Sequence, residues 1–354
     1  MKRIDLETPA LTVDIRAMRR NMKRMADVMA SSPMKFYPHY KSHKCPAIAW
    51  LQLAAGADGI TCSKLGEAED LCDAGIPNIV LANQVVQPGK LPRLAAVAAK
   101  TRLTVCVDHA ENVLALEKAM AARGGGILHV LVEFEVGQHR CGVDTFEEFL
   151  ALAKLIEAQP HLSFEGIQAY AGHMSHEADA EKRREEILRI EDVVVRLKSY
   201  CEENGLQVAE ICGGSTGFAK DKPLDTVYTQ AQYGSYLFMD ASFLPLGLDF
   251  EQALFVDTTV LSVGPDRAVV DCGTKTMTMD QDPPRILELP GAKLIFNEEH
   301  TMILSGSTGL KIGDRLRYIP GHCCTTINIF DEMAVLDGDD VVDVWKIASR
   351  GKAQ

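Results

Sequence analysis

Short apolar runs and amphipathic stretches alternate along residues 35–236 of this 354-residue chain. The runs that read as strands lie at residues 35–41, 58–63, 78–83, 103–108, 129–136, 164–172, 207–214 and 229–236. Regular alternation of strands and helices predicts right-handed crossovers and a parallel sheet. Eight strands, in a sequence with neither a GxGxxG nor a P-loop motif, favour a closed (β/α)8 TIM barrel over a doubly wound sheet.

The pattern differs at both ends of the chain. Near the N-terminus, apolar residues at three- and four-residue steps predict a helix with one buried face, namely Ile15, Met18, Met22, Met25 and Met29. After about residue 245, strand-like runs are separated by turns, without helices long enough for crossovers. We therefore expect a barrel over 15–245 and a C-terminal antiparallel β-domain that also includes residues 1–14, formed by 1–14 with 246–354.

Composition limits the possible partners. The net charge is −12 and no basic cluster stands out, which argues against nucleic acid and anionic membranes. No apolar run reaches the roughly 18–20 residues of a membrane span, and the N-terminus lacks the apolar core of a secretory signal. The ten cysteines therefore read as reduced thiols of a cytoplasmic protein.

Polar residues gather where the predicted strands end, which is where eight-stranded barrels carry their active sites. The first, third, fifth and sixth strands end near His39, Lys41, His43, Lys44, Asn83, Gln84, Arg140, Gln168, Tyr170, His173 and His176. The loops GGSTG (213–217) and YGS (233–235) follow the seventh and eighth strands, where such barrels hold phosphate. Either loop alone is also typical of a plain turn.

A lysine in the barrel mouth has a chemical use. When partly removed from water, a lysine has a lowered pKa and forms Schiff bases; a lysine of a surface loop is the alternative for Lys41. Together with two phosphate loops, Lys41 indicates pyridoxal phosphate, whose ring acts as an electron sink.

The segment PGHCCTTINIFD (320–331) places a histidine beside two cysteines. If this segment is extended, His322 and Cys324 face one side and Cys323 faces the other. That geometry argues against a redox pair of adjacent cysteines and favours a two-ligand platform for a divalent ion. Two buried residues of a β-strand are the alternative.

The whole chain resembles the D-threonine aldolase/D-serine dehydratase group of the fold-type III pyridoxal-phosphate enzymes, which have an alanine-racemase-like barrel. The matching segments run in order from TPALTVDIRAMRRNM through PHYKSHKCP, VEFEVGQHRCGV, GIQAYAGHMSH, GGSTG, QYGSYLFMDASF and VVDCGTKTMTMD to PGHCCTTINIFD. GIQAYAGHMSH and the Asn-x-x-Asp after the metal motif look like the aldolase branch, which includes 3-hydroxy-D-aspartate aldolases.

The resemblance implies a set of site residues. Lys41 would carry the cofactor as a Schiff base, Arg140 would face the pyridine nitrogen, and Tyr170 would lie beside the ring. His176 would stand near the substrate hydroxyl. The phosphate would be held by Gly214, Ser215, Thr216, Gly234, Ser235 and Tyr236. The metal ligands would be His322 and Cys324, where the aldolase-like enzymes usually have Asp in place of Cys324. Because a thiolate favours zinc, the metal (Mn²⁺, Mg²⁺ or Zn²⁺) stays open.

We hypothesise a lyase that cleaves D-3-hydroxy amino acids, D-threonine-like or 3-hydroxy-D-aspartate-like, to glycine and an aldehyde. The alternatives are a metal-dependent D-serine or D-3-hydroxyaspartate dehydratase and a non-catalytic pyridoxal-phosphate-binding protein. The resemblance also implies a homodimer.

Overall fold

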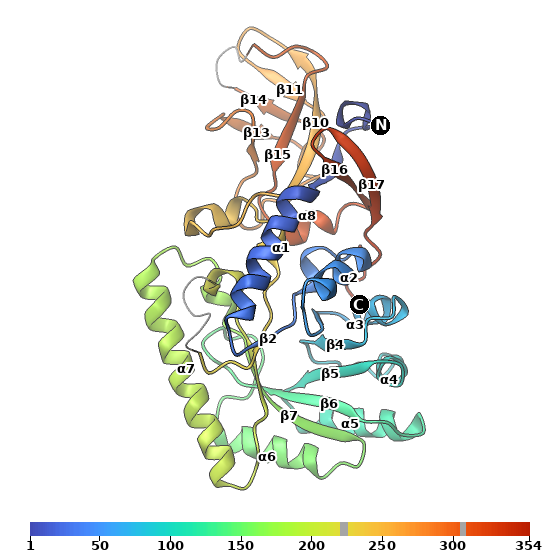
Figure 1. Ribbon diagram of the computed structural model, residues 1–354, viewed down its shortest axis with the longest axis vertical. Helices are drawn as coiled ribbons and strands as arrows, with labels where there is room; N and C mark the ends of the chain where they lie inside the picture. The colour runs from blue at the N-terminus through green and yellow to red at the C-terminus, as the bar shows by residue number, and fades with distance from the viewer. Residues whose placement is uncertain (220–225, 305–308) are drawn as a thin grey trace. The chain divides into compact units, whose positions relative to one another are not determined.

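The computed structural model describes residues 1–219, 226–304 and 309–354 (Figure 1). The chain forms two compact units. The barrel unit consists of residues 26–41, 48–234 and 352–354, and the sheet unit consists of residues 1–25, 42–47 and 235–351. The boundaries expected from the sequence stay a prediction of how the chain divides into domains.

Eight parallel strands are found in the part of the barrel unit that the structure describes. They are β2 (Lys35–Phe36), β3 (Ile60–Cys62), β4 (Asn78–Leu81), β5 (Arg102–Val107), β6 (Leu128–Glu133), β7 (Leu162–Ala169), β8 (Glu210–Gly213) and β9 (Gln230–Ala231). Their order in the sheet is β2-β9-β8-β7-β6-β5-β4-β3. The two ends of this order meet, because a parallel bridge joins His39 to Thr61 and the Thr61 N–H donates to the Pro38 carbonyl at 3.0 Å. The predicted eight-stranded barrel is confirmed.

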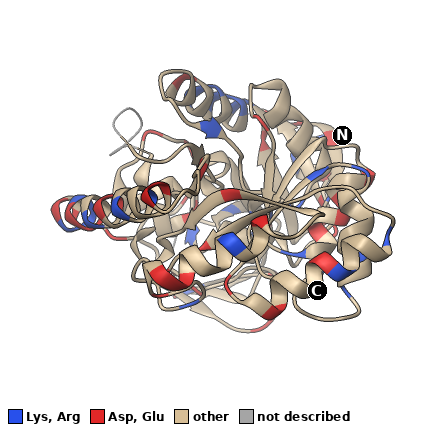
Figure 2. Cartoon of the chain, turned by 90° about the horizontal axis from the view of Figure 1, so that it is seen from below, with Lys and Arg blue, Asp and Glu red and all other residues tan. Residues whose placement is uncertain are grey.

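Helices alternate with these strands along the chain. They are α3 (Leu65–Asp73), α4 (Leu91–Ala98), α5 (Ala110–Ala122), α6 (Phe146–Glu157) and α7 (Ala180–Glu203). Helix α6 begins at a capping box, in which Thr145 Oγ1 accepts from the Glu148 N–H while the Glu148 carboxylate accepts from the Thr145 N–H, both at 3.2 Å. Basic and acidic residues are interspersed along the helices, as Figure 2 shows. Two further helices, α1 (Ile15–Ala30) and α2 (Pro46–Ala54), contribute residues to both units.

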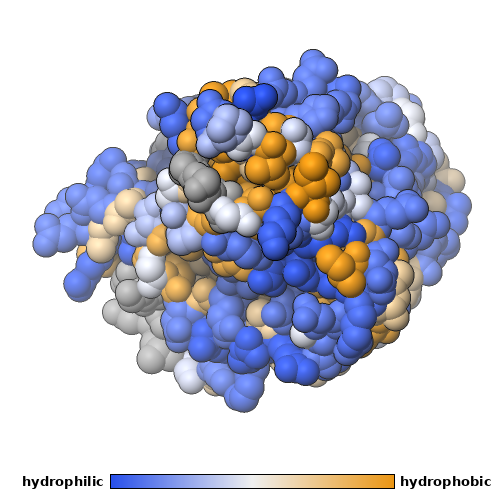
Figure 3. Space-filling model, turned by 90° about the horizontal axis from the view of Figure 1, so that it is seen from above, coloured by the Kyte–Doolittle hydropathy of each residue, from blue (hydrophilic) through white to orange (hydrophobic). Residues whose placement is uncertain are grey.

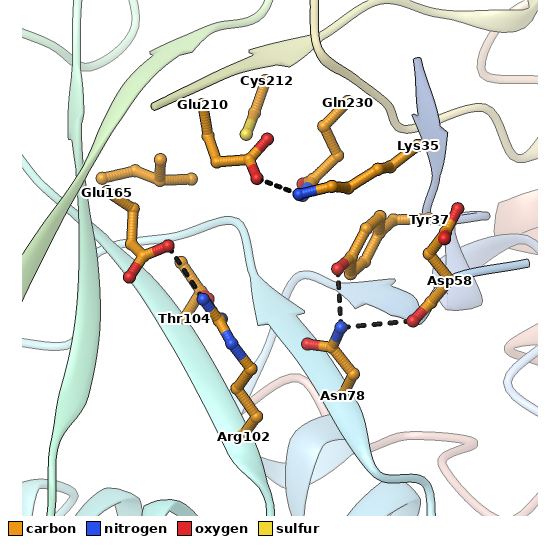
Figure 4. A pocket seen from close by; sticks show the side chains of 11 residues that line it. Lys35, Tyr37, Asp58, Asn78, Arg102, Thr104, Glu165, Glu210, Cys212 and Gln230 are labelled. Atoms are coloured by element: carbon orange, nitrogen blue, oxygen red, sulfur yellow. Dashed lines mark hydrogen bonds and ion pairs between the residues drawn. The ribbon is translucent and has the colours of Figure 1, made fainter. Parts of the chain in front are cut away.

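Polar side chains close the floor of the barrel at the N-terminal ends of its strands. They line a cavity of about 290 Å³ (Figure 4). Lys35 pairs with Glu210, and Arg102 donates to Glu165 at 2.8 Å. His129 Nδ1 lies 2.5 Å from the same Glu165 carboxylate. Because each pair joins different strands, these contacts tie the lower ring of the barrel together.

We expect Glu165→Gln to destabilise the barrel. Burial opposes ionisation, but the hydrogen bond from His129 and the charge of Arg102 lower the pKa of Glu165 below its ordinary value. A carboxyl with a depressed pKa contributes stability above its unfolded pKa and loses that contribution as the pH falls through its folded pKa. The substitution should cost about 1–3 kcal/mol of unfolding free energy at neutral pH. Chemical denaturation at several pH values checks this, and an equal loss at pH 7 and at about pH 3, below the ordinary pKa range of Glu, would contradict it.

The described residues of the sheet unit form nine strands. They are β1 (Ala10–Asp14), β10 (Leu254–Val263), β11 (Ala268–Val270), β12 (Arg285–Ile286), β13 (Leu294–Phe296), β14 (Thr301–Ile303), β15 (Arg315–Ile319), β16 (Glu332–Asp337) and β17 (Asp340–Lys346). All pairs are antiparallel except β1 with β16. The predicted antiparallel β-domain, with the N-terminal strand as a member, is confirmed.

Short helical segments complete the described chain. They are the 3-10 turns Arg3–Asp5, Tyr40–Ser42, Gly172–Met174, Thr216–Phe218, Ser235–Leu237 and Ala241–Leu246, and the helix α8 (Cys323–Ile327). The apolar stripe of α1 is buried as predicted: its five residues, Ile15, Met18, Met22, Met25 and Met29, are at most 7% exposed. Among the described helices, none combines the length and apolar character needed to cross a bilayer. The cytoplasmic location stays a prediction.

Candidate active site

Lys41 and Arg140 lie over the same aromatic ring, that of Tyr170. The Lys41 Nζ is 5.7 Å from the ring centroid, and the guanidinium carbon of Arg140 is 5.3 Å from it. Lys41 is in the turn Tyr40–Ser42 after β2, Tyr170 follows β7, and Arg140 is in the loop after β6. Three side chains from three loops at the C-terminal ends of the strands therefore meet in one place. Both cations are within the range of a cation–π contact.

Glycine at position 172 lets the Tyr170 ring occupy this place. A Cβ on Gly172 would lie 2.6 Å from Tyr170 Cε1 and 2.9 Å from Gln138 Nε2, closer than real Cβ atoms approach other atoms. The Gly172 N–H donates to Gln138 Oε1 at 3.0 Å, which ties the loop after β6 to the loop after β7. The loops that carry Arg140 and Tyr170 are thus joined directly.

His39 fixes the turn that carries Lys41. It is buried, and its Nδ1 accepts from the Lys41 N–H at 3.4 Å. With Nδ1 acting as an acceptor, the ring proton belongs on Nε2, which lies 3.3 Å from Ser63 Oγ. Deeper in the barrel, the buried amides of Gln168 and Gln232 hydrogen-bond to each other at 3.1 and 3.2 Å.

The loop after β8 has the shape of an anion cradle. Ser215 is 6% exposed, and its buried Oγ has no hydrogen-bond partner among the described residues. Gly214 has φ +79°, and a Cβ there would lie 2.7 Å from Tyr233 Cε1. Thr216 is also buried. A buried hydroxyl without a hydrogen-bond partner, next to a glycine that has no side chain of its own, fits a phosphate group. Gly234 belongs to the same barrel unit, whereas Ser235 and Tyr236 belong to the sheet unit.

We expect Gly214→Ala to weaken cofactor binding. The added methyl group would clash with Tyr233 and would place alanine at a positive φ, so the loop must move. A shift of this kind costs of the order of 1–3 kcal/mol, or about 5- to 150-fold in affinity. Titration of the apoprotein with pyridoxal phosphate measures the change. Gly89→Ala is the matched control, because a Cβ at Gly89 meets nothing within 4 Å and its φ is not positive. Unchanged affinity in Gly214→Ala would contradict the proposed cradle.

The two histidines after β7 have different surroundings. His173 is in the turn Gly172–Met174, and its Nε2 lies 3.4 Å from Glu186 Oε1 on α7. His176 follows this turn and is half-buried. His173 is therefore engaged by a surface carboxylate, and His176 is the better candidate for proton transfer.

The structure corrects the expected conformation around His322. β15 ends at Ile319, and Cys323–Ile327 form the helix α8, so the segment is not extended. His322 is the residue that precedes the helix, and the buried Asp240 carboxylate accepts from the Cys323 N–H at 2.7 Å. A hydrogen bond to this N–H, at the start of α8, favours a helical conformation of the segment over a strand. The Sγ atoms of Cys323 and Cys324 are 3.9 Å apart, so the expectation that they diverge was wrong; the two thiols do not form a disulfide.

His322 and Cys324 nevertheless lie side by side, and Asp280 orients the histidine. His322 Nδ1 donates to Asp280 Oδ2 at 2.7 Å, and Asp280 also accepts from Thr325 Oγ1 at 2.8 Å. Burial opposes protonation of the imidazole, but its hydrogen bonds with Cys324 and Asp280 raise the pKa of His322 to about 9.

These residues fit a divalent metal ion. A carboxylate that holds one imidazole nitrogen leaves the other nitrogen for a metal, which is the usual arrangement around metal-bound histidines. A neighbouring thiol is a soft ligand that favours zinc. In the described parts of the chain, no group of three or more His, Cys, Asp or Glu side chains is gathered as a metal site. His322 and Cys324 would therefore be a two-ligand platform.

Two carboxylates near these sites were not identified from the sequence. Asp280 lies in VVDCGTKTMTMD, at a loop position without periodicity, and no signal in a single sequence pairs it with His322. Glu133 ends β6 and lies 3.6 Å from Arg140. A charged residue that ends an otherwise apolar strand, as in HVLVE, is a signal that could have drawn attention to Glu133.

The fold and this cluster define a class of pyridoxal-phosphate enzyme. The family described as "Alanine racemase, N-terminal domain" matches residues 13–242, and that described as "Putative serine dehydratase domain" matches residues 253–336. The chain belongs to the D-threonine aldolase/D-serine dehydratase family of fold-type III enzymes, which are pyridoxal-phosphate-dependent.

Individual relatives match over nearly the whole chain. A D-threonine aldolase of Arthrobacter sp. is 37% identical, over 98% of this chain and 93% of the relative. A 3-hydroxy-D-aspartate aldolase of Paracoccus denitrificans (strain Pd 1222) is 35% identical, over 99% and 94%. A D-threo-3-hydroxyaspartate dehydratase of Delftia sp. (strain HT23) is 29% identical, over 97% of both. The crystal structure of D-threonine aldolase from Filomicrobium marinum superposes with a TM-score of 0.96 at 34% identity, over 99% of this chain and 98% of that one.

Proposed function

We propose that this chain is an aldolase that cleaves D-3-hydroxy amino acids to glycine and an aldehyde. The observation that carries the proposal is the meeting of Lys41 and Arg140 on the Tyr170 ring, in a chain that is more similar to the aldolases than to the dehydratase. A primary amine and a permanent cation at the mouth of a barrel are what a pyridoxal-phosphate site requires.

The barrel residues would divide the binding of the cofactor among them. Lys41 would offer the amine that holds the cofactor's aldehyde. The hydroxyls of Ser215 and Thr216 would donate hydrogen bonds to its phosphate. Arg140 would face the ring nitrogen; since a guanidinium does not lose its proton in proteins, it would hold that nitrogen unprotonated. When bound, pyridoxal phosphate supplies an electron sink for the electron pair released at Cα.

His176 would move the proton that cleavage requires. In a retro-aldol reaction the β-hydroxyl must lose its proton as that oxygen becomes the oxygen of the aldehyde product. A neutral imidazole within hydrogen-bonding distance of the hydroxyl accepts that proton as a general base. Tyr170 would support the cofactor ring, and its contact with Lys41 would keep the amine at the barrel mouth.

The sheet unit would hold the metal ion through His322 and Cys324, with Asp280 orienting the histidine. A divalent ion supplies Lewis-acid chemistry, which lowers the pKa of an alcohol that it binds. The thiol of Cys324 favours Zn²⁺ over Mn²⁺ and Mg²⁺.

An incubation tests the proposal directly. The holoprotein is given D-threonine or D-3-hydroxyaspartate with Mn²⁺, Mg²⁺ or Zn²⁺, and glycine and ammonia are measured together. We expect glycine and an aldehyde in equal amounts, with little ammonia. Ammonia and a keto acid without glycine would overturn the aldolase assignment.

Elimination is the second candidate, and two observations favour it. Residues 253–336 match a putative serine dehydratase domain, and Cys324 stands where the aldolase-like enzymes usually have Asp. In this reaction a base, for which Lys41 is a candidate, would remove the Cα proton and the β-hydroxyl would leave. The same incubation distinguishes the two outcomes.

We also propose that the chain functions as a homodimer. Apolar side chains of the sheet unit are exposed by 40–56%, namely Leu261, Val263, Ile295, Val342 and Val344. Figure 3 shows apolar surface gathered on the face seen from above. Exposed apolar side chains of this kind are candidates for the contact between two copies of the chain. Light scattering of the holoprotein should give twice the 38.8 kDa of one chain.

A further inference from the structure

The loop that carries Arg140 is anchored by a buried acid at its base. Glu133 is the last residue of β6 and is 6% exposed. The Val143 N–H donates to the Glu133 carbonyl at 2.9 Å, and the Glu135 N–H donates to the Val143 carbonyl at 3.0 Å. The backbone thus leaves and rejoins the barrel at Glu133. Its side chain is buried and does not point into solvent.

The carboxylate of Glu133 is held from two directions. One oxygen, Oε2, accepts from Gln84 Nε2 at 2.6 Å. The other, Oε1, lies 3.6 Å from an Arg140 nitrogen. Gln84 Nε2 also lies 3.3 Å from Asp108 Oδ2, which accepts from the Gly142 N–H at 3.1 Å. The amide of Gln84 therefore fixes Glu133 in place and connects it to the far end of the same loop.

This arrangement suits a counter-ion. Burial raises the pKa of Glu133, while the hydrogen bond from Gln84 and the charge of Arg140 act in the opposite direction. The Arg140 side chain is 51% exposed, so water alone would leave it many orientations. Contacts with the Glu133 carboxylate and with the Tyr170 ring limit these orientations of the guanidinium. Opposite charges partly cancel each other. A carboxylate beside Arg140 therefore also weakens the electric field that the guanidinium exerts on more distant groups.

We propose that Glu133 is a positioning residue for Arg140, and that its negative charge limits how strongly Arg140 withdraws electrons from the ring nitrogen of the cofactor. The inference rests on the proposed function, because it requires bound pyridoxal phosphate beside Arg140. When the cofactor ring withdraws electrons less strongly, the bonds to Cα are weakened less in general. Cleavage is then favoured at the bond that the general base acts on. Glu133 would therefore help to restrict the enzyme to one reaction.

Glu133→Gln tests this inference, because it removes the charge while retaining the shape and an acceptor for Gln84. The measurement is the ¹⁵N NMR resonance of ring-labelled pyridoxal phosphate bound to the protein, which reports directly on the ring nitrogen. We expect the resonance to move upfield, because an uncompensated guanidinium is a stronger hydrogen-bond donor. We also expect exchange of the Cα proton of D-alanine, which has no β-hydroxyl to cleave, to become roughly tenfold faster, the order that one nearby unit charge produces in a protein.

The matched control is Asp144→Asn, which removes one negative charge from the exposed end of the same loop. Its resonance and exchange rate should equal those of the wild type. A wild-type resonance in Glu133→Gln would overturn the inference. If Glu133→Gln does not fold or does not bind the cofactor, Glu133→Asp is measured in its place, because its carboxylate is farther from Arg140 by one methylene. A smaller upfield shift of the resonance in Glu133→Asp supports the inference, and no shift overturns it. Failure of the wild type to bind pyridoxal phosphate would instead reject the proposed function.

Discussion

Replacing Lys41 with alanine should lower cleavage of D-threonine by more than the roughly 10²–10⁴-fold that loss of one proton-transferring group costs, because without the Lys41 amine the cofactor is not held. The holoprotein should also lose its yellow colour. Steady-state kinetics and the visible absorption spectrum together measure both effects.

Lys41→Arg separates the role of the positive charge at this position from the role of the primary amine. Arginine keeps a cation over the Tyr170 ring but cannot form a Schiff base under physiological conditions, because its guanidinium stays protonated. We expect it to be as inactive as Lys41→Ala, with a melting temperature close to that of the wild type. Normal activity and colour in either variant would show that a different amine holds the cofactor.

Replacing His322 with alanine should remove the stimulation of activity by divalent ions. The substitution deletes one of two proposed ligands, so the loss of metal affinity should exceed the roughly 10–100-fold that follows loss of a residue which only orients a ligand. The measurement is a metal titration of the chelator-treated holoprotein, with affinity and activity followed together. His300→Ala is the control, because His300 is an exposed histidine in the same unit.

Cys324→Asp provides the complementary result. It replaces a soft sulfur ligand with a hard oxygen ligand, so the preference should move from Zn²⁺ towards Mn²⁺ and Mg²⁺. An unchanged order of metal affinities would show that Cys324 does not bind the ion. Metal-stimulated activity that persists in His322→Ala would remove the two-ligand platform altogether.

The barrel could be predicted because its signals are local and repeated. Each strand is a short apolar run such as NIVLAN or LTVCVD, and each helix is an amphipathic stretch of suitable length. The position of Lys41 at the barrel mouth followed from the rule that strand ends carry the active site, and the structure places Lys41, Tyr170 and Arg140 together as that rule requires.

The residues around His322 could not be predicted in the same way. RLRYIPGHCCTTINI has the composition of a strand, yet Cys323–Ile327 are helical. The decisive contact is the Cys323 N–H with the carboxylate of Asp240, which is more than eighty residues earlier in the chain. A tertiary hydrogen bond to a buried carboxylate outweighs the small difference in local preference between strand and helix.

The sequence by itself determined the barrel, the added β-sheet, the family and the residue types of both candidate sites, because periodicity and ordered motifs are properties of the chain alone. Only the tertiary structure decided which acids lie beside those residues and which side chains hold these acids in place. Asp280 is 42 positions from His322, and Gln84 is 49 positions from Glu133. Such partners are chosen by the three-dimensional packing of loops, where a carboxylate that approaches an imidazole or an amide within 3 Å is held by a hydrogen bond that no spacing in the sequence encodes.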